Sequence, residues 1–335
     1  MRTFDKKLLV SALVFSASAH AGSFTDNLPK QCLPGALCAD NSHPGFYASV
    51  TGSWLQPSET EIGMVTDSWQ IVNNGTSTVD EDRSVDPDYE FEGGFTIGYD
   101  IQDSANSIEL NYQHLSNSTK GYNPTNGEAL FTSYFFPGAS FVPTPDFVSD
   151  ATLKYEVDHA NLKLLRTYSQ FDEKFSIKPA LGIDYARLKH DFTFMAPGYV
   201  RSDFTGFGPM LSLDGSYKLG NNFGITGYLG SSMLVGHSDA DSYLGFGGDV
   251  KFLAHDLDRM VTTLSGRVGV NYNYAFSNMN IFAEVGYQAT EYFNAFDMIR
   301  GNITLAPSLM GLGIDDIITT NFAVNGPYLK IGIHV

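Results

Sequence analysis

Hydrophobic and polar residues alternate along much of this chain with a period of two. From Tyr89 to Ile101 every odd position is aromatic, aliphatic or glycine, and every even position is polar or small. Such alternation predicts a β-strand with one apolar face. The rhythm recurs from Phe46 to the C-terminal residues, in runs long enough to cross a bilayer. A strand in hydrocarbon must pair its backbone groups around a closed cylinder, so the pattern predicts an all-β, transmembrane antiparallel β-barrel.

The alternation predicts about ten strands, separated by connections of unequal length. The strands are expected near 46–55, 89–101, 107–115, 153–166, 174–188, 206–219, 223–236, 262–276, 280–292 and 322–335. Short polar turns at 102–106, 167–173, 220–222 and 277–279 alternate with long segments at 56–88, 116–152, 189–205, 237–261 and 293–321. Short periplasmic turns and long external loops are typical of outer-membrane barrels. An even strand count places both chain ends on the periplasmic side.

One predicted strand does not keep a single phase. Leu153, Tyr155 and Val157 occupy odd positions, whereas Leu162 and Leu164 occupy even ones. This break predicts a β-bulge near His159, or a strand end placed too far along the chain.

The N-terminal residues predict a secretory signal peptide over 1–21, because basic residues precede a short apolar stretch and Ala19-His20-Ala21 supplies a cleavage site. The apolar stretch is about half the roughly 20 residues of a spanning helix. A periplasmic leader over 22–43 and the barrel over 44–335 are expected to follow. Removing the signal peptide takes away three basic residues and one acidic residue, so the net charge falls from −17 to −19. A chain this acidic is not expected to bind nucleic acid.

The two cysteines, Cys32 and Cys38, lie in the leader with Pro34-Gly35 between them. In an oxidising compartment the spacing favours a local disulfide, and a cross-link between subunits is the alternative. The spacing is not Cys-x-x-Cys, so neither a redox-active nor a metal role is expected. No cofactor is predicted.

The even positions of the strands are expected to face the barrel lumen, which gives it charges of both signs. The predicted lumen-lining residues are Glu90, Glu92, Glu109, Asp184, Asp214, Arg267, Glu284 and Lys330. Lysines such as Lys154 and Lys178 would pair with inward carboxylates. A barrel of about eight strands is nearly filled by its own side chains, whereas open channels are well established at about sixteen strands. Ten strands therefore leave both a narrow pore and a plugged lumen open.

The external segments carry most of the acidity. Eight acidic residues and one arginine lie in 57–88, and the predicted acidic mouth consists of Asp80, Glu81, Asp82, Asp86 and Asp88. Such a mouth concentrates cations and predicts a weakly cation-preferring pore for small hydrophilic solutes or ions. A solvated surface that only prevents aggregation is the alternative.

The sequence offers little support for catalysis. An omptin-like surface protease needs an Asp–His couple at the outer edge of the barrel. The candidates for this couple are His237 with Asp239 and Asp241, and His255 with Asp256 and Asp258. Neither couple comes with a second carboxylate pair, so no enzyme activity is expected. A non-conducting adhesin or structural barrel is the stronger alternative to a pore. Contact with outer-membrane lipid and with lipopolysaccharide phosphates is expected at Arg187, Lys189, His190 and Arg201.

Several segments resemble one known family. The signal peptide ending in AHA, the Cys-containing leader, PGFYASVTGSWLQPS, FEGGFTIGYDI, YARL and the terminal YLKIGIHV are similar to the major outer-membrane protein family of Legionella-type bacteria. The resemblance implies a pore-forming, porin-like surface protein. It also implies disulfide linkage in some members and recognition by host surface factors. The sequence leaves open whether the protein is a monomer or a homo-oligomer.

Overall fold

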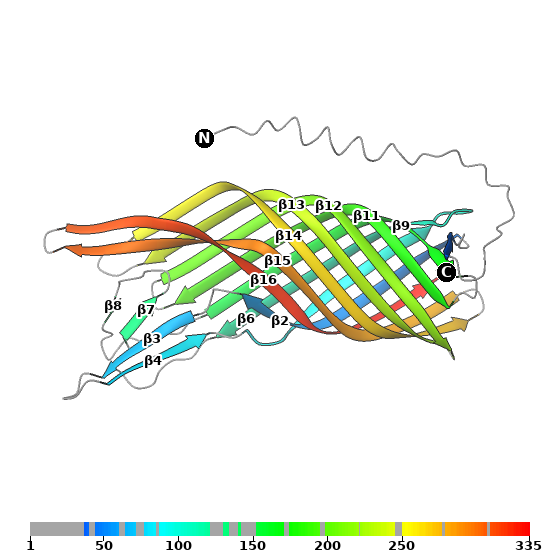
Figure 1. The fold of residues 1–335 in the computed structure, drawn as a ribbon, viewed down its shortest axis with the longest axis horizontal. Helices are drawn as coiled ribbons and strands as arrows, with labels where there is room; N and C mark the ends of the chain where they lie inside the picture. The colour runs from blue at the N-terminus through cyan, green and yellow to red at the C-terminus, as the bar shows by residue number, and fades with distance from the viewer. Residues whose placement is uncertain are drawn as a thin grey trace.

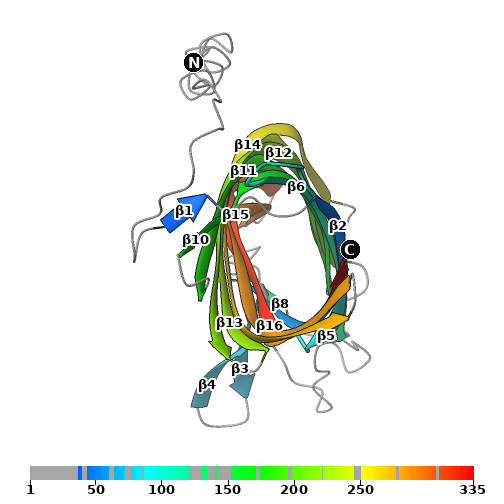
Figure 2. The ribbon, with the colours of Figure 1, turned by 90° about the vertical axis from the view of Figure 1, so that its right-hand side faces the viewer.

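The protein is an antiparallel β-barrel in a computed structural model that describes residues 37–39, 44–59, 64–71, 77–84, 87–120, 130–133, 140–141, 152–170, 174–194, 198–220, 222–244, 250–276, 279–306 and 309–335. Ten strands form the wall, and β16 pairs with β2 to close the ring (Figures 1 and 2). The fold class and the strand number are as predicted. The wall strands are β2 (Gly45–Glu59), β5 (Glu90–Asp100), β6 (Asn106–Lys120), β9 (Thr152–Arg166), β11 (Phe175–Phe194), β12 (Gly198–Gly220), β13 (Phe223–Leu244), β14 (Val250–Phe276), β15 (Met279–Ala306) and β16 (Leu309–His334).

The short turns gather at the barrel end that holds the C-terminal residue, here called the inner end (Figure 1). Backbone hydrogen bonds connect neighbouring turns there, such as Thr167 N to Ala105 O, and Val335 N donates to Phe46 O. Asp103 and Asn222 have φ of 55° and 70°, a conformation in which Asp and Asn are tolerated. At this end β1 (Leu37–Ala39) pairs with β10 (Tyr168–Gln170). Cys38 lies in β1 and Cys32 lies outside the described residues, so the disulfide stays a prediction, as does the signal peptide.

The predicted lipid face is exposed around the barrel. Val50, Leu181 and Phe207 are more than 60 % exposed, whereas the inward Thr96 and Asp184 are buried. Aromatic pairs mark the two edges of this apolar belt, with Phe46 against Tyr99 near the inner end and Trp54 against Phe91 toward the outer end. The alternation of the sequence therefore assigns the lipid face correctly.

Three of the five predicted long loops are mostly strand. β11–β12, β13–β14 and β15–β16 continue far above the apolar belt, and only 195–197, 245–249 and 307–308 separate them outside the described residues. The prediction was wrong here because it followed the lipid-facing residues. Above the belt the outward positions become polar, as at Arg187, Lys189 and Asp191, so the oily alternation ends while the strands continue.

The other two long segments carry a second sheet. β3 (Met64–Ile71), β4 (Ser77–Ser84), β7 (Leu130–Ser133) and β8 (Ser140–Phe141) pair in the order β4-β3-β7-β8 at the outer end (Figure 1). Parts of both predicted loops are therefore paired strand.

The predicted bulge near His159 is absent. β9 pairs without a register shift with β6 and with β11 over its described length. Leu162 and Leu164 face lipid, whereas Leu153, Tyr155 and Val157 face the interior and are buried. The apolar face of the strand changes sides at the outer edge of the lipid belt, because above that edge water lies outside and the packed core lies inside.

The hydrophobic core thus fills the outer half of the barrel. It gathers inward residues from nine of the ten wall strands, all except β5, including Leu55, Leu115, Tyr155, Leu188, Phe204, Leu234, Val261, Phe296 and Phe322. The inner half keeps a polar interior. The lumen changes from polar to apolar along the barrel axis, and this change defines the candidate site.

Candidate functional site: the barrel lumen

The inner half of the lumen contains a polar cavity of about 470 Å³. Residues beside the inner-end turns, such as Lys218, Asn273 and Asn280, line it, which places the cavity at that end. Its ionisable side chains are Tyr47, Asp100, Glu109, Lys178, Asp214, Lys218, Arg267, Glu284, Lys330 and His334. These positions alternate with the lipid-facing residues of the same strands.

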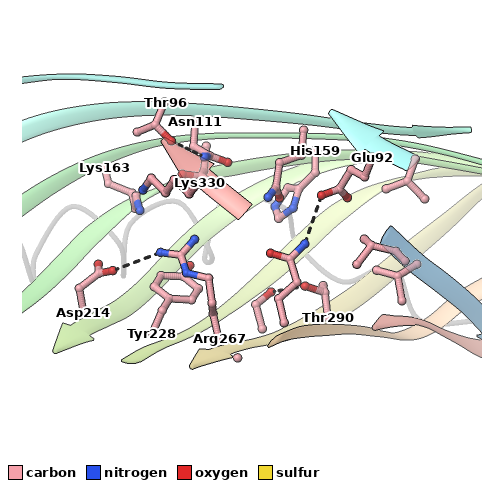
Figure 3. A pocket seen from close by; sticks show the side chains of 18 of the residues that line it. Glu92, Thr96, Asn111, His159, Lys163, Asp214, Tyr228, Arg267, Thr290 and Lys330 are labelled. Atoms are coloured by element: carbon pink, nitrogen blue, oxygen red, sulfur yellow. Dashed lines mark hydrogen bonds and ion pairs between the residues drawn. The ribbon is translucent and has the colours of Figure 1, made fainter. Parts of the chain in front are cut away.

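A smaller cavity of about 80 Å³ lies farther along the lumen (Figure 3). Glu92, His159 and Gln288 line it together with Tyr292. Four charged residues line both cavities and so form the layer between them: Glu109, Asp214, Arg267 and Lys330. The two cavities together present five carboxylates and five Lys or Arg side chains, so their charges nearly balance.

Three of the four charges of the layer between the cavities, those of Glu109, Asp214 and Arg267, are held in ion pairs. Lys163 Nζ lies 2.7 Å from Glu109 Oε1. Arg267 Nε lies 3.5 Å from Glu284 Oε1, and its Nη2 lies 3.9 Å from Asp214 Oδ1. The ring of Tyr228 lies 5.4 Å from Lys163 Nζ and 5.3 Å from the Arg267 guanidinium. Charges in a narrow interior are expected to pair, because each unpaired one would lack compensation.

A hydrogen-bonded chain closes the top of the polar half. Asp184 Oδ1 lies 2.6 Å from His159 Nε2, and Ser232 Oγ donates to Asp184 Oδ2 over 2.6 Å. Tyr292 Oη lies 3.4 Å from the other ring nitrogen of His159. The tyrosine ring also stacks on Phe322, 6.0 Å away between ring centroids. Tyr292 therefore joins the polar network below to the apolar core above.

Above this chain, β15 bends into the lumen. Phe293, Asn294 and Ala295 stand opposite the single residue Asn321 of β16, and Asn294 has a φ of 57°. Ala295, Phe296, Asp297 and Met298 are then buried in succession, at 1 % exposure or less. Regular strand residues alternate between two faces, so four consecutive buried residues show that the strand leaves the wall. We call residues 293–298 the inward bulge.

Aromatic rings complete the closure around the inward bulge. The Phe296 ring lies 6.1 Å from Tyr155, 5.3 Å from Phe322 and 5.5 Å from His190. These rings come from β15, β9, β16 and β11, on different sides of the barrel. Side chains that line an open pore are exposed to water, whereas Phe296 and Phe322 are 0 % exposed. The outer half of the lumen is therefore closed by an apolar constriction.

Two ionisable groups lie within this apolar layer. The carboxyl group of Glu59 accepts a hydrogen bond from Tyr155 Oη at 2.8 Å and another from Thr320 Oγ1. Burial raises the pKa of Glu59 to about 8, although both hydrogen bonds oppose the shift. Burial lowers the pKa of His190 to about 3, and neither of its ring nitrogens has a hydrogen-bond partner among the described residues. Both groups are therefore neutral near pH 7.

The structure brings most of the predicted lumen residues together. Glu92, Glu109, Asp214, Arg267, Glu284 and Lys330 line the cavities, and Asp184 lies buried behind His159. Glu90 is exposed, at the first residue of β5. Lys154 faces outward and is also exposed, so its predicted inward pairing was wrong. Lys178 does line the larger cavity.

The acidic mouth is only partly described. Asp80, Glu81 and Asp82 lie in β4 of the outer sheet, and Asp86 lies outside the described residues. Asp88 is exposed; its backbone N–H donates to Thr119 Oγ1, and its carbonyl accepts from Asn117 Nδ2.

Sequence reasoning missed His159, Lys163 and Tyr155 as lumen residues. The assumed bulge near His159 left the phase of this strand unassigned. A continuous strand with Leu162 and Leu164 facing lipid would have placed all three inside.

The histidine and aspartate couples considered for catalysis lie on the outer wall. His237 Nδ1 is 3.7 Å from Asp258 Oδ1, and His255 Nδ1 is 3.3 Å from Asp239 Oδ1, with all four side chains more than half exposed. Asp241 pairs with Lys251 at 3.7 Å. The part of the chain that the structure describes contains no group of three or more His, Cys, Asp or Glu residues arranged to hold a metal ion.

The cations expected at the outer rim stand just above the lipid belt, each beside a carboxylate. Arg187 pairs with Asp203, Lys189 with Glu156, and Arg201 with Asp191. His190 was placed wrongly, because it faces the interior and is 1 % exposed. It belongs to the inward set of β11 with Leu188 and Phe192, and it cannot contact lipid.

Several solved structures of other proteins are similar to this chain at low sequence identity. The outer membrane protease OmpT from Escherichia coli covers 91 % of the chain and is covered over 98 % of its own length, at 11 % identity and a TM-score of 0.44. A TodX deltaS2S3 mutant, a monoaromatic hydrocarbon channel, gives 10 % identity, coverages of 90 % and 91 % and a TM-score of 0.32. A Pseudomonas aeruginosa FadL homologue has 9 % sequence identity and a TM-score of 0.29, and the match covers 87 % of this chain and 90 % of the homologue. No curated protein sequence matches the chain.

Among the described residues, no helix is both long and apolar enough to cross a membrane. The family described as Legionella pneumophila major outer membrane protein precursor matches residues 41–335, which is nearly all of the predicted leader-to-terminus region. The match spans every strand of the closed ten-stranded wall. The chain therefore belongs to the family of the Legionella pneumophila major outer membrane protein and is a β-barrel of the bacterial outer membrane.

Proposed function

We propose that this barrel is a porin-like, non-enzymatic protein whose lumen is closed at rest and conducts small ions weakly when the constriction opens. The observation that carries the proposal is the division of the lumen. Polar cavities of about 470 and 80 Å³ occupy the inner part, and one apolar layer around Phe296 and Phe322 separates them from the outside. Apolar constrictions gate channels because water leaves them readily.

The selectivity follows from the charge distribution. The cavity walls carry five carboxylates and five Lys or Arg side chains, so the lumen itself discriminates little between cations and anions. The external segment 57–88 has eight acidic residues and one arginine. We therefore expect the pore to prefer cations weakly, and we expect this preference to decrease as the ionic strength rises.

Planar-bilayer recording tests the proposal on three forms of the protein. The wild-type barrel should open rarely and briefly, whereas Phe296→Ser should conduct for a much larger fraction of the time. Phe207→Ser is the matched control, because Phe207 is an aromatic residue exposed on the lipid face. It should behave as the wild type. Silence of all three forms, with folding verified by heat-modifiable mobility on gels, would reject the pore.

A non-conducting surface scaffold is the second candidate. The complete burial of Phe296, Phe322 and Leu188 favours it, since the constriction is packed like a protein core. The extension of β11–β16 above the lipid belt would then serve to present the outer hairpins. The recording separates the two candidates, because a scaffold predicts no conductance even in Phe296→Ser.

The lipid partner is part of the same proposal. Arg187, Lys189 and Arg201 stand just above the lipid belt, the level at which we expect the phosphates of lipopolysaccharide. Their exposed ion pairs are individually weak, at about 0–1 kcal/mol. A phosphate can therefore displace a carboxylate at little cost. Thermal stabilisation by added lipopolysaccharide should decrease when all three are replaced by Gln, and should persist when the neutral outer-wall residues Ser116 and Ser118 are replaced by Ala.

A further inference from the structure

We infer that the inward bulge of β15, residues 293–298, is the gate of this barrel, and that the lumen opens when the β15–β16 hairpin moves away from the wall formed by β12 and β14. The inference rests on the proposed function. It assigns the closing element to one strand.

The first support is the backbone pairing of this segment. The ladder between β14 and β15 ends at the pair Thr262 and Phe293. Beyond it, β15 pairs only with β16 among the described residues, from Phe296 opposite Thr320 up to Ala306. The ladder between β16 and β2 ends at Phe322 opposite Glu59. Above these levels the hairpin holds its own backbone hydrogen bonds, so it can move without breaking the barrel wall.

The second support is the conformation at the start of the bulge. Three residues of β15 face one residue of β16, and Asn294 adopts a positive φ of 57°. The Asn294 backbone N–H donates to Asn321 Oδ1 at 3.0 Å, and Thr319 Oγ1 donates to the Asn294 side chain at 3.3 Å. A bulge locally bends a strand and increases its twist. This point is therefore the natural hinge, and the residues beyond it are the ones that fill the lumen.

The third support is the polar contact between the bulge and the opposite wall. Asp297 N donates to Ser202 Oγ of β12 at 3.0 Å, and the Asp297 carboxylate pairs with Arg259 of β14. The contact with Ser202 crosses the interior, because β12 is not a neighbour of β15 in the ring. The contact with Arg259 reaches β14 beyond Thr262, where its backbone ladder with β15 has ended. Together the two contacts latch the bulge to the opposite wall and to the upper part of β14.

The latch leaves several buried polar atoms without hydrogen bonds. Asp297 Oδ2 and Arg259 Nε in the latch have no hydrogen-bond partner among the described residues. The two ring nitrogens of His190, whose ring lies 5.5 Å from that of Phe296, have none either. Such atoms are costly to bury, and water satisfies them when it reaches them. Hydration of the latch therefore favours the open state, while burial of the Phe296 ring favours the closed one. This opposition makes the bulge a two-state element.

A disulfide across the latch tests the gate. In a background with Cys32→Ser and Cys38→Ser, Ser202→Cys and Asp297→Cys should form a cross-link that holds the bulge in the lumen. Oxidised protein should show no openings in planar bilayers, and reduction should raise the open probability at least tenfold. The matched control is Ser118→Cys with Lys154→Cys, two residues that stand opposite each other on β6 and β9 and are exposed on the outer wall, away from the lumen. Oxidation of that pair should leave the openings unchanged.

Deletion of Asn294 and Ala295 tests the same gate without a cross-link. It removes the two extra residues of β15, so that Phe293 alone stands opposite Asn321 of β16 and the bulge is lost. This variant should conduct at least tenfold more often than the wild type. Equal conductance of the oxidised and reduced latch forms, with the cross-link verified by mass, overturns the gate and leaves the pore proposal intact. A deletion variant that conducts no more than the wild type also overturns it. Folded protein that never conducts in any form removes the pore proposal itself.

Discussion

The ring of Tyr155, in β9, lies 4.9 Å from the ring of Phe322, in β16, although β2, β5 and β6 separate these two strands around the barrel. The contact therefore crosses the lumen. It exists because both residues face inward above the lipid belt, where the interior is apolar. The Tyr155 hydroxyl continues across to Glu59 on β2, so one side chain connects three parts of the wall.

The first prediction concerns this contact. Phe322→Ala removes a fully buried ring and should destabilise the folded barrel by about 3–5 kcal/mol, as large-to-small core substitutions do. The measurement is the unfolding midpoint in detergent, followed by tryptophan fluorescence. Phe276→Ala removes a ring that is 60 % exposed near the inner end and should cost far less. Equal losses in the two variants would mean that Phe322 is not part of a packed core.

The second prediction compares neighbouring residues on one strand. Val50 is 63 % exposed near the middle of the lipid belt, and Ser49 lines the larger cavity. Val50→Arg should impair assembly by about 2–4 kcal/mol, as expected for Arg near the bilayer midplane. Ser49→Arg has the same depth but reaches an aqueous cavity, so it should fold much better. Refolding yield into detergent or lipid vesicles measures both, and similar yields would contradict the assigned faces.

The third prediction concerns the ion pair between Lys163 and Glu109, whose side chains are 7 % and 15 % exposed. Lys163→Met leaves a carboxylate without its partner and should destabilise the barrel by about 3–5 kcal/mol, and Glu109→Gln should do so similarly. The double variant should be substantially more stable than the sum of the two losses predicts. A double-mutant cycle of unfolding free energies measures the coupling. Strict additivity would show that the two groups do not compensate each other.

The fourth prediction follows from the raised pKa of Glu59. The ordinary pKa of this carboxyl is 4.5 and burial raises it to about 8 in the folded protein. Between these values the folded state keeps a proton that the unfolded chain has lost, so the contribution of Glu59 to stability falls as the pH rises through this interval. Above about pH 8 the contribution is constant. Glu59→Gln should remove this decline.

The measurement for Glu59 is the unfolding midpoint at pH 5, 7 and 9. The difference between Glu59→Gln and wild type should grow in favour of the variant from pH 5 to pH 9. Glu90→Gln, an exposed carboxylate at the start of β5, should show no such trend. A constant difference across the three pH values would rule out a buried, protonated Glu59.

The strand count and the lipid face were predictable because hydrocarbon imposes one strict rule. Outward residues such as Phe95 and Ile183 must be apolar over the width of the bilayer, so alternation identifies them directly. Above the lipid belt water lies outside, the rule reverses, and Tyr155 or Phe204 faces inward instead. The same reversal explains both the shortened strands and the false bulge near His159.

The closure of the lumen was not predictable from alternation. The inward bulge depends on Asn294 at a positive φ and on contacts of Phe296 with residues far away in the sequence, such as Tyr155. A local period carries no information about which inward side chains meet across a barrel. The polar half was easier to predict, because inward carboxylates such as Glu109 and Glu284 alternate with the apolar lipid-facing residues of the same strands.

The fifth prediction concerns ion selectivity and uses the Phe296→Ser variant, in which the constriction is expected to be open. In that background, replacing Asp80, Asp82, Asp86 and Asp88 by Asn and Glu81 by Gln should lower the cation-to-anion permeability ratio. The external carboxylates act through their field, which salt screens over about 10 Å at 0.1 M and about 3 Å at 1 M. The decrease should therefore be larger in dilute salt.

Reversal potentials under a salt gradient measure the ratio at both concentrations. Asp103→Asn, in an exposed turn at the inner end, is the control and should change the ratio little, because a single charge there lies at the opposite opening from the mouth. The near balance of charges along the cavity walls means that the external field is the main source of selectivity. If the ratio stays the same in dilute salt after all five replacements, the preference resides in the lumen, and the acidic mouth serves only as a solvated surface.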